Sequence, residues 1–408
     1  MRPWSSVVIP ALPGKTASLS LWNAVSQKVE PTRVVDGKAS LYVCGITPYD
    51  STHMGHATTY VTFDLVHRLL IDAGHDVNYV QNVTDIDDPL LERALKLNQS
   101  WESIAAKEVT RFKDDMVALR VLAPQSYVQV TDHMSRIVEW VSRLIDANLA
   151  YVVDSDIYFD TSSSQALGDV SHFSQAEMLE LFAQRGGDPD RKGKRNQLDP
   201  LLWRGKREGE PSWLAPFGDG RPGWHIECVA IAADMAGRPI TVQGGGRDLV
   251  FPHHEMCNVQ SLSLDGVPFA STFAHAGMVH YQGEKMSKSL GNLVFISEMI
   301  SAGSDPMAIR LAIIASHYRS DWEWTDERMQ LAERRLETWR RALAMQAGAD
   351  GASLLSGLRH TLCQDLDTPA ALSLIDAWAH DTLAGNTEDE TSQGLVSRAL
   401  DALLGITL

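Results

Sequence analysis

The chain has 408 residues, of which 44% are hydrophobic and 22% are charged, a composition typical of a globular protein with two or three domains. Residues 1–15 lack the apolar core of a secretory signal, and no apolar run approaches the roughly 20 residues of a membrane helix, so we expect a soluble cytoplasmic protein. The net charge of −16 makes nucleic-acid binding unfavourable unless a local basic patch compensates.

A strand, a helix and a second strand are predicted near the N-terminus. Residues 39–44 are apolar and end in Cys-Gly, residues 58–73 carry apolar side chains at helical spacing, and residues 77–81 are again strand-like. This order predicts the first crossover of a parallel sheet. Because ligands bind beyond the carboxyl ends of such strands, we expect segments 44–56 and 82–85 to face a ligand.

The middle of the chain is expected to form an insertion between two halves of the sheet. Residues 131–147 predict a helix, and residues 151–159 alternate like one strand. Residues 184–200 are rich in Gly, Arg, Lys and Asp and predict a polar loop. Beyond this region, residues 240–243 and 273–279 predict two further strands.

The last part of the chain has a helical pattern. Asp305 and Pro306 predict a helix start, and that helix is expected to run through Ile314. Thr325 predicts the cap of a longer helix. Residues 348–357 are rich in Gly, Ala and Ser and predict a break before short helices at the end. The buried stripe of the longer helix is expected to contain Met329, Ala332, Leu336, Trp339 and Leu343.

The segment His53-Met54-Gly55-His56 is expected just before the helix at 58–73. Backbone N–H groups at a helix N-terminus favour anions, and two imidazoles there can stabilise charge that develops on a phosphate. Gly55 lets a nucleotide approach the backbone closely. Taken alone, a solvated polar turn fits this segment equally well.

Two further segments are candidates for nucleotide binding. Residues 285–289 read Lys-Met-Ser-Lys-Ser between glycines, and Lys285 and Lys288 suit a clamp for β- and γ-phosphates. Residues 244–248 read Gly-Gly-Gly-Arg-Asp, and Asp248 could accept hydrogen bonds from ribose hydroxyls. A solvated charged loop and an ordinary glycine-rich turn are the alternatives.

Cys44, Cys228 and His253 are the candidate metal ligands. Zinc prefers thiolate and imidazole ligands, and a catalytic zinc keeps one position open. Their spacing does not establish a metal, because each thiol can equally be a small buried side chain. His254, Glu255 and Cys257 are alternative ligands or neighbours that orient the ligands. An open zinc could bind a substrate thiolate and reject a hydroxyl analogue.

Together and in this order, these segments resemble the class I aminoacyl-tRNA synthetases, and in particular their cysteine-activating branch. The HxGH and KMSKS signatures are both present, and residues 84–88, 220–228 and 251–255 are similar to that branch as well. The resemblance covers roughly residues 19–324. It implies an α/β fold: a Rossmann-type parallel-sheet catalytic core with an inserted connective subdomain and a C-terminal α-helical region.

The resemblance also implies the domain limits and the site. The two halves of the Rossmann domain would be residues 1–120 and 216–282, and the connective insertion between them would be residues 121–215. The KMSKS loop and the stem-contact helices would follow at 283–347. A short helical domain without an anticodon-binding module would occupy 348–408. ATP, with Mg²⁺, would activate cysteine, and His53, His56, Lys285 and Lys288 would act on the phosphates. Zinc on Cys44, Cys228 and His253 would bind the substrate thiolate. The cysteinyl-adenylate pocket would contain Cys44, Gly45, Ile46, Thr47, Thr59, Asn82, Val83, Thr84, Trp224, Gly246, Arg247, Asp248 and Val279.

Four features depart from cysteinyl-tRNA synthetase. Residues 44–49 differ from its usual Cys-Gly-Pro-Thr-Val-Tyr run, and Cys257 stands where its fourth zinc ligand, a glutamate, is usual. The chain ends early, and residues 351–408 contain two arginines, no lysine and eight acidic residues. Residues 184–189 resemble the ERGGDP signature of the related ATP-dependent cysteine ligases of mycothiol biosynthesis.

These departures imply a small amine acceptor in place of a tRNA. The expected partners are L-cysteine, ATP and glucosaminyl-inositol, with no nucleic acid and no membrane, and a monomer is expected. The alternatives are a cysteinyl-tRNA synthetase with a reduced tail and a catalytically inert synthetase-like binding protein.

Overall fold

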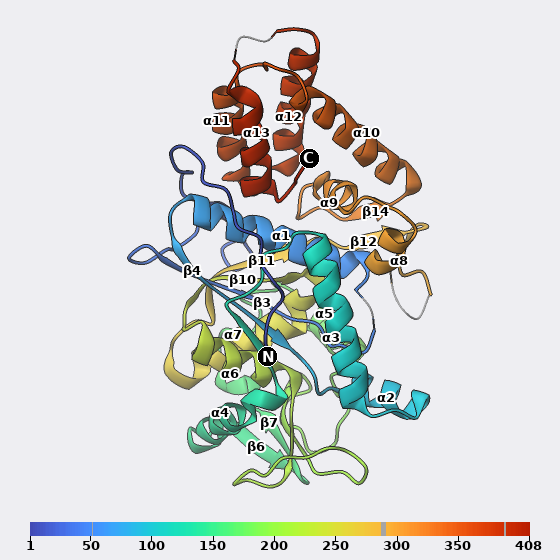
Figure 1. Cartoon of the computed structure of the whole chain (residues 1–408). Helices are drawn as coiled ribbons and strands as arrows, with labels where there is room; N and C mark the ends of the chain where they lie inside the picture. The colour runs from blue at the N-terminus through green and yellow to red at the C-terminus, as the bar shows by residue number, and fades with distance from the viewer. Residues whose placement is uncertain (51, 287–290, 387–388) are drawn as a thin grey trace.

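The computed structural model describes residues 1–50, 52–286, 291–386 and 389–408. Its centre is a five-stranded sheet in which all neighbouring strands are parallel (Figure 1). The strands are β3 (Lys38–Val43), β4 (Asp76–Val83), β5 (Ser126–Gln129), β10 (Ile240–Gly246) and β11 (Ala270–Ala276). Their spatial order is β11-β10-β3-β4-β5, which confirms the predicted parallel sheet. The connections reverse direction between β3 and β10, where ligands bind in such sheets.

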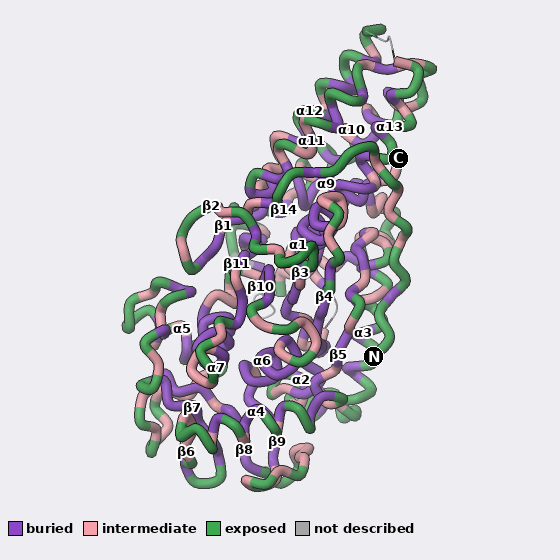
Figure 2. Tube along the Cα trace, turned by 90° about the vertical axis from the view of Figure 1, so that its left-hand side faces the viewer, coloured by how far each residue is buried: buried purple, intermediate pink, exposed green. Residues whose placement is uncertain are grey.

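Helices cover both faces of this sheet (Figure 1). They are α1 (Met54–Asp72), α3 (Trp101–Ala118), α4 (Met134–Asp146), α6 (Trp224–Met235) and α7 (Glu255–Asp265). Helix α2 (Asp88–Leu97) packs against α3 instead. Side chains of β3 alternate between the faces. Leu41 and Val43 join the core with α1 and α3, whereas Tyr42 and the next residue after the strand, Cys44, join the core with α4, α6 and α7. Figure 2 shows buried residues concentrated along β3, β10 and β11.

A four-stranded antiparallel sheet is inserted between β5 and α6. Its strands are β6 (Ala150–Val153), β7 (Asp156–Phe159), β8 (Leu201–Gly205) and β9 (Gly220–Pro222). The single strand predicted at 151–159 is wrong, because Asp154 adopts a left-handed φ of 56° and turns the chain into a β6-β7 hairpin. The polar loop predicted at 184–200 is confirmed from Arg185 onward, and Gln184 is the last residue of α5 (Gln175–Gln184).

The division of the chain into five parts stays a prediction. Strand β5 belongs to the central sheet and β9 to the inserted one. These memberships favour insertion limits near Gln129 and Pro222, somewhat later than the proposed 121–215.

The chain after β11 is largely helical. The helices are α8 (Ile296–Ser301), α9 (Pro306–Ile314), α10 (Asp326–Leu343), α11 (Gly351–Leu362), α12 (Thr368–Leu383) and α13 (Ser392–Ala399). Short strands complete the fold: β12 (Val279–Tyr281), β13 (Glu284–Lys285) and β14 (Trp322–Trp324) form one sheet, and β1 (Ser20–Asn23) pairs with β2 (Lys28–Pro31). In Figure 1 the bundle of α10–α13 and the inserted sheet lie at opposite ends of the molecule.

Capping side chains explain where these helices begin. Thr325 accepts a hydrogen bond from the Arg328 N–H, as predicted for a cap. Of the predicted stripe on α10, all but the partly buried Leu343 are buried. The break predicted at 348–357 is wrong after Asp350, because its carboxylate accepts the N–H groups of Ala352 and Ser353 and starts α11.

Two other predicted boundaries are displaced. Helix α1 begins at Met54 because Nδ1 of His53 accepts the Gly55 N–H (3.1 Å) and caps it, so the HxGH segment forms the first turn. The strand predicted at 273–279 ends at Ala276 instead. None of the helices in the described part of the chain combines the length and apolar character that a membrane span requires.

Candidate functional site

The loops after β3 and β4 form one connected floor at the carboxyl edge of the sheet. The Asn82 Oδ1 accepts hydrogen bonds from the Gly45 N–H (2.8 Å) and the Tyr42 hydroxyl (3.1 Å). The Asn82 amide donates to Thr84 Oγ1 (3.2 Å), and the Thr84 N–H donates to the Ile46 carbonyl (3.0 Å). A Cβ at Gly45 would lie 1.6 Å from the Asn82 carbonyl oxygen, so this close approach requires glycine.

The glycine run at the end of β10 adjoins the same floor. The Cys44 N–H donates to the Gly244 carbonyl (3.2 Å). A Cβ at Gly246 would lie 3.7 Å from the Thr59 hydroxyl on α1. The predicted pocket segments 44–47, 82–84 and 246–248 therefore meet at the junction of β3 with its two neighbours.

Cys44, Cys228 and His253 lie together although they come from three different elements. One ligand atom from each lies within 4.8 Å of the other two, and all three side chains are buried. Cys228 follows Trp224 by one turn of α6, which places both on the side of the helix that faces the sheet edge. The Trp224 ring stacks on the His253 imidazole with centroids 4.2 Å apart.

The electrostatics of this cluster suit a metal cation. Hydrogen bonding with Cys44, together with burial, raises the pKa of the Cys228 thiol well above its ordinary value. Burial, reinforced by His225, holds the pKa of His253 well below its ordinary value, so this imidazole is neutral. A nearby dication would favour the thiolates. Two thiols and a neutral imidazole are the donor set that zinc prefers.

Hydrogen bonds around the cluster orient its members. Nδ1 of His225 lies 3.0 Å from Nδ1 of His253, a contact that orients the His253 ring. The Gln243 side-chain amide donates to Cys44 Sγ (3.2 Å), and its nitrogen lies 2.9 Å from Nε2 of His254. These contacts fix the ring of His253 and the sulfur of Cys44.

Cys257 and His254 are neighbours of the cluster. Cys257 Sγ lies 4.0 Å from Nε2 of His253, and its thiol donates to the His225 carbonyl. Nδ1 of His254 lies 2.8 Å from Nε2 of His275. Among the described residues, the closely spaced set of ligand atoms contains neither Cys257 nor His254.

The two histidines of the HxGH segment lie together at the start of α1. Their rings stack with centroids 3.9 Å apart and an interplanar angle of 28°. His53 caps the helix, and His56 lies in its first turn. The pair is therefore at the positive end of the helix dipole, where a phosphate would be stabilised.

Comparison with known proteins places the chain in a family. Residues 30–334 match the family described as tRNA synthetases class I (C) catalytic domain. The chain belongs to this family. It is 53% identical to the L-cysteine:1D-myo-inositol 2-amino-2-deoxy-alpha-D-glucopyranoside ligase of Thermobispora bispora, over 100% of both chains. It is 49% identical to the protein of the same name from Mycobacterium sp. (strain KMS), over 100% of this chain and 99% of that one.

Solved structures support the class I synthetase fold. A structure of Mycobacterium tuberculosis methionyl-tRNA synthetase in complex with methionyl-adenylate has a TM-score of 0.64, with 15% identity, 90% of this chain and 89% of that chain covered. At this identity the likeness concerns the fold alone. It agrees with the predicted parallel-sheet core and the helical C-terminal region.

Of the KMSKS segment at 285–289, the structure describes the first two residues. Lys285 ends β13, and Met286 is buried with its N–H donating to the carbonyl of the buried Val279 (3.2 Å). Residues 287–290, which include the predicted phosphate ligand Lys288, lie outside the described residues. The start of the KMSKS segment is therefore hydrogen-bonded to Val279, a predicted pocket residue.

The side chain of Arg247, a predicted pocket residue, points toward the segment before β14. Its guanidinium pairs with the Asp321 carboxylate (Nη1–Oδ2 3.0 Å) and also donates to the Arg319 carbonyl. The side chain therefore fastens the turn at 246–248 to the segment before β14.

Sequence reasoning included His225 in the family-like segment 220–228 without giving it a role, and it did not single out Gln243. Both side chains contact the proposed ligands. For Gln243, the available signal was a polar amide within a strand expected to be buried. For His225, it was the position next to Trp224.

Proposed function

We propose that this protein activates L-cysteine with ATP and joins it to the amine of 1D-myo-inositol 2-amino-2-deoxy-α-D-glucopyranoside, as a ligase of mycothiol biosynthesis. The observation that carries the proposal is the end-to-end identity of 53% with a ligase of this name. The buried cluster of Cys44, Cys228 and His253 supports the choice of cysteine as the activated substrate.

The cluster suits recognition of the cysteine side chain. Cys44, Cys228 and His253 would hold zinc, which when bound would supply a soft open position for the substrate sulfur. Serine lacks that soft ligand, so the site would reject it. Trp224 stacks on His253 and so keeps the ring in its orientation.

The remaining proposed residues place ATP beside the cysteine carboxylate. Asp248 in the turn at 246–248 would bind the ribose, and Thr59 lies close to that turn. His53, His56, Lys285 and Lys288 would stabilise the phosphates, with Mg²⁺ as the counter-ion. The position of the His pair at the start of α1 supports this assignment.

The reaction has two steps. The carboxylate of cysteine attacks the α-phosphate of ATP, which forms cysteinyl-adenylate and releases diphosphate. The amine of the glucosaminyl-inositol then attacks the activated carbonyl, loses one proton and displaces AMP. Positioning and charge stabilisation by the pocket supply most of the rate.

We also propose that the protein works as a cytoplasmic monomer without a nucleic-acid partner. The net charge of −16 supports the absence of a nucleic-acid partner, as does the composition of residues 351–408, with two arginines, no lysine and eight acidic residues. Such a surface repels a phosphate backbone.

AMP release tests the acceptor directly. With ATP and cysteine present, glucosaminyl-inositol should stimulate AMP release, whereas cysteine tRNA should not, and serine in place of cysteine should give no stimulation. Unsubstituted inositol, which lacks the amine, is the matched control. Stimulation by the tRNA alone would overturn the ligase assignment.

A further inference from the structure

The signature at residues 184–189 has no place in the proposed pocket or in the metal cluster, although it first separated this chain from the tRNA synthetases. Its glycines make a sharp turn at the end of α5. Gly186 has a φ of +87°, and a Cβ at Gly187 would lie 2.4 Å from the ring of Phe182. Both positions therefore require glycine, and the turn directs the preceding Arg185.

The Arg185 side chain reaches out of the insertion to the strand–helix connection of the core. Its Nη1 donates to the carbonyl of Asp248 (2.5 Å) and also to the carbonyl of Phe251. Phe251 is extended (φ −138°, ψ 136°) within the irregular turn Val250–His254, so its carbonyl is outside a regular helical ladder. One guanidinium thus joins the proposed ribose-binding turn to the turn that carries His253.

The insertion also binds the C-terminal end of the strand–helix connection, at Glu255. The buried Glu255 carboxylate accepts hydrogen bonds from the N–H groups of Gly168 (2.9 Å), Val170 (3.2 Å) and Ser171 (2.7 Å). Residues 248–255 are therefore held by the insertion on both sides of His253.

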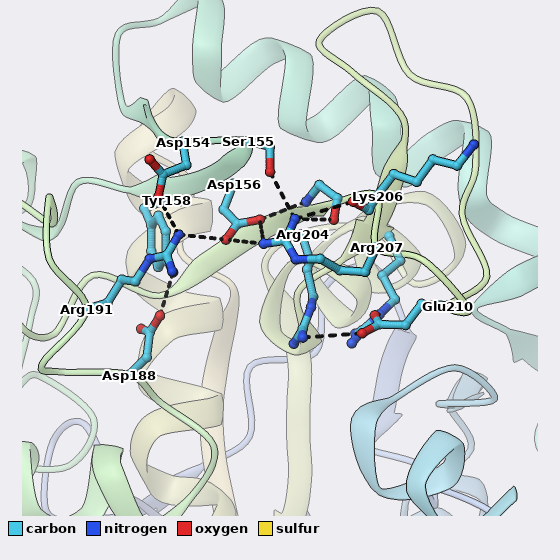
Figure 3. A network of polar contacts seen from close by, with 12 residues as sticks. Asp154, Ser155, Asp156, Tyr158, Asp188, Arg191, Arg204, Lys206, Arg207 and Glu210 are labelled. Atoms are coloured by element: carbon cyan, nitrogen blue, oxygen red, sulfur yellow. Dashed lines mark hydrogen bonds and ion pairs between the residues drawn. The ribbon is translucent and has the colours of Figure 1, made fainter. Parts of the chain in front are cut away.

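The signature loop has its own anchors, independent of Arg185. Asp188 accepts a hydrogen bond from the Tyr158 hydroxyl (2.5 Å) and pairs with Lys194 (2.9 Å). Arg191 pairs with Asp154 (2.8 Å) and, more distantly, with Asp156 in the network on the inserted sheet (Figure 3). The loop can stay attached to the insertion when Arg185 is changed.

We propose that Arg185 is a positioning residue for the adenylation step: by holding the Asp248 and Phe251 carbonyls, it sets the ribose-binding turn at a fixed place relative to His253. The insertion is then part of the activating site, since it fixes the geometry between the nucleotide and the amino acid. The inference rests on the proposed function for its kinetic test.

Arg185→Ala, Arg185→Lys and the control Arg191→Ala test this role. Arg191 is an arginine of the same loop whose partners lie on the inserted sheet. The measurements are the Kd of ATP by calorimetry, the KM values of ATP and cysteine in diphosphate–ATP exchange, and the unfolding temperature.

Arg185→Ala should raise the Kd and KM of ATP by about tenfold, the loss expected for a charged hydrogen bond that holds the binding turn. Arg185→Lys should recover part of this loss, because an ammonium can reach the carbonyls but lacks the planar fork. Arg191→Ala should lower the unfolding temperature and leave the Kd of ATP within about twofold.

An unchanged ATP affinity in a folded Arg185→Ala protein would overturn the positioning role, and so would an equal loss in Arg191→Ala. If Arg185→Ala does not fold, the lysine variant carries the same test by its ATP Kd. A wild-type protein that shows no cysteine-dependent exchange would instead overturn the proposed function, while the calorimetric comparison would still decide the role of Arg185.

Discussion

Asp64 on α1 is a buried acid whose removal should strongly affect stability. Its carboxylate pairs with Arg68 (2.7 Å) and with Arg310 of α9, and it accepts the Leu122 N–H (2.8 Å). The side chains of Asp64 and both arginines are fully buried. Asp64→Asn would leave two guanidinium groups in the core without their shared counter-charge.

The expected loss follows from this burial. Breaking a buried ion pair by removing one partner costs about 3–5 kcal/mol. Unfolding entropy of about 2.1 cal/mol/K per residue gives the 408-residue chain roughly 0.9 kcal/mol/K, so the unfolding temperature should fall by about 4–6 °C. The matched control is Glu92→Gln, which breaks the exposed i,i+4 pair with Lys96 and should cost less than about 0.5 kcal/mol.

The stabilising effect of Asp64 should depend on pH. Burial alone would raise the pKa of Asp64, but Arg68 and Arg310 outweigh it and hold the pKa below its ordinary value. The stabilisation is therefore present above the unfolded pKa of about 4 and is lost as pH falls through the folded pKa. Scanning calorimetry of both variants at pH 7 and pH 4 measures this. Equal shifts for Asp64→Asn and Glu92→Gln at pH 7 would refute the reasoning.

Three other predictions concern the site and its surroundings. Cys228→Ala should lose bound zinc by elemental analysis, and Cys363→Ala should retain it; zinc retained in both would contradict the ligand assignment. Burial raises the pKa of Asp115 to about 7, so stability is lost as pH rises from the unfolded pKa of about 4 to that value, and the loss is complete above it. Asp115→Asn should therefore raise the unfolding temperature at pH 8 more than at pH 5. Gly45→Ala would force a Cβ against the Asn82 carbonyl and should reduce cysteine-dependent exchange by roughly 100-fold; wild-type exchange would show that the floor is not rigid.

The parallel sheet was predictable because its signals are local. Apolar runs at 39–44 and 77–81 around an amphipathic helix fix a crossover, and the carboxyl edge then follows from topology. The hairpin at 151–159 was not predictable from alternation, because both of its strands continue the same pattern and the turn depends on Asp154 adopting a left-handed conformation.

The site was predictable only in part, for a related reason. Cys44 follows a predicted strand, but the meeting of Cys228 with His253 depends on how α6 and the turn after β10 pack. Donor chemistry made these three residues candidates, but their spacing left alternatives open, and only the resemblance to a family favoured that set over them. The Arg185 contact could not be predicted at all, because backbone carbonyls accept hydrogen bonds regardless of which residue carries them.

The Asp64 cluster also connects the C-terminal helices to the helix that begins with the HxGH segment. Arg310 donates to the Leu404 carbonyl (2.6 Å) and Arg68 to the Asp401 carbonyl (2.7 Å), so residues near the end of the chain are bonded to the middle of α1. Because His53 and His56 lie at the other end of α1, Asp64→Asn should loosen the C-terminal helices before it disturbs the histidine pair. We therefore expect faster proteolysis within 389–408 at a temperature where cysteine-dependent exchange is still near the wild-type rate. Loss of exchange without faster proteolysis would indicate that the cluster acts on the histidines directly.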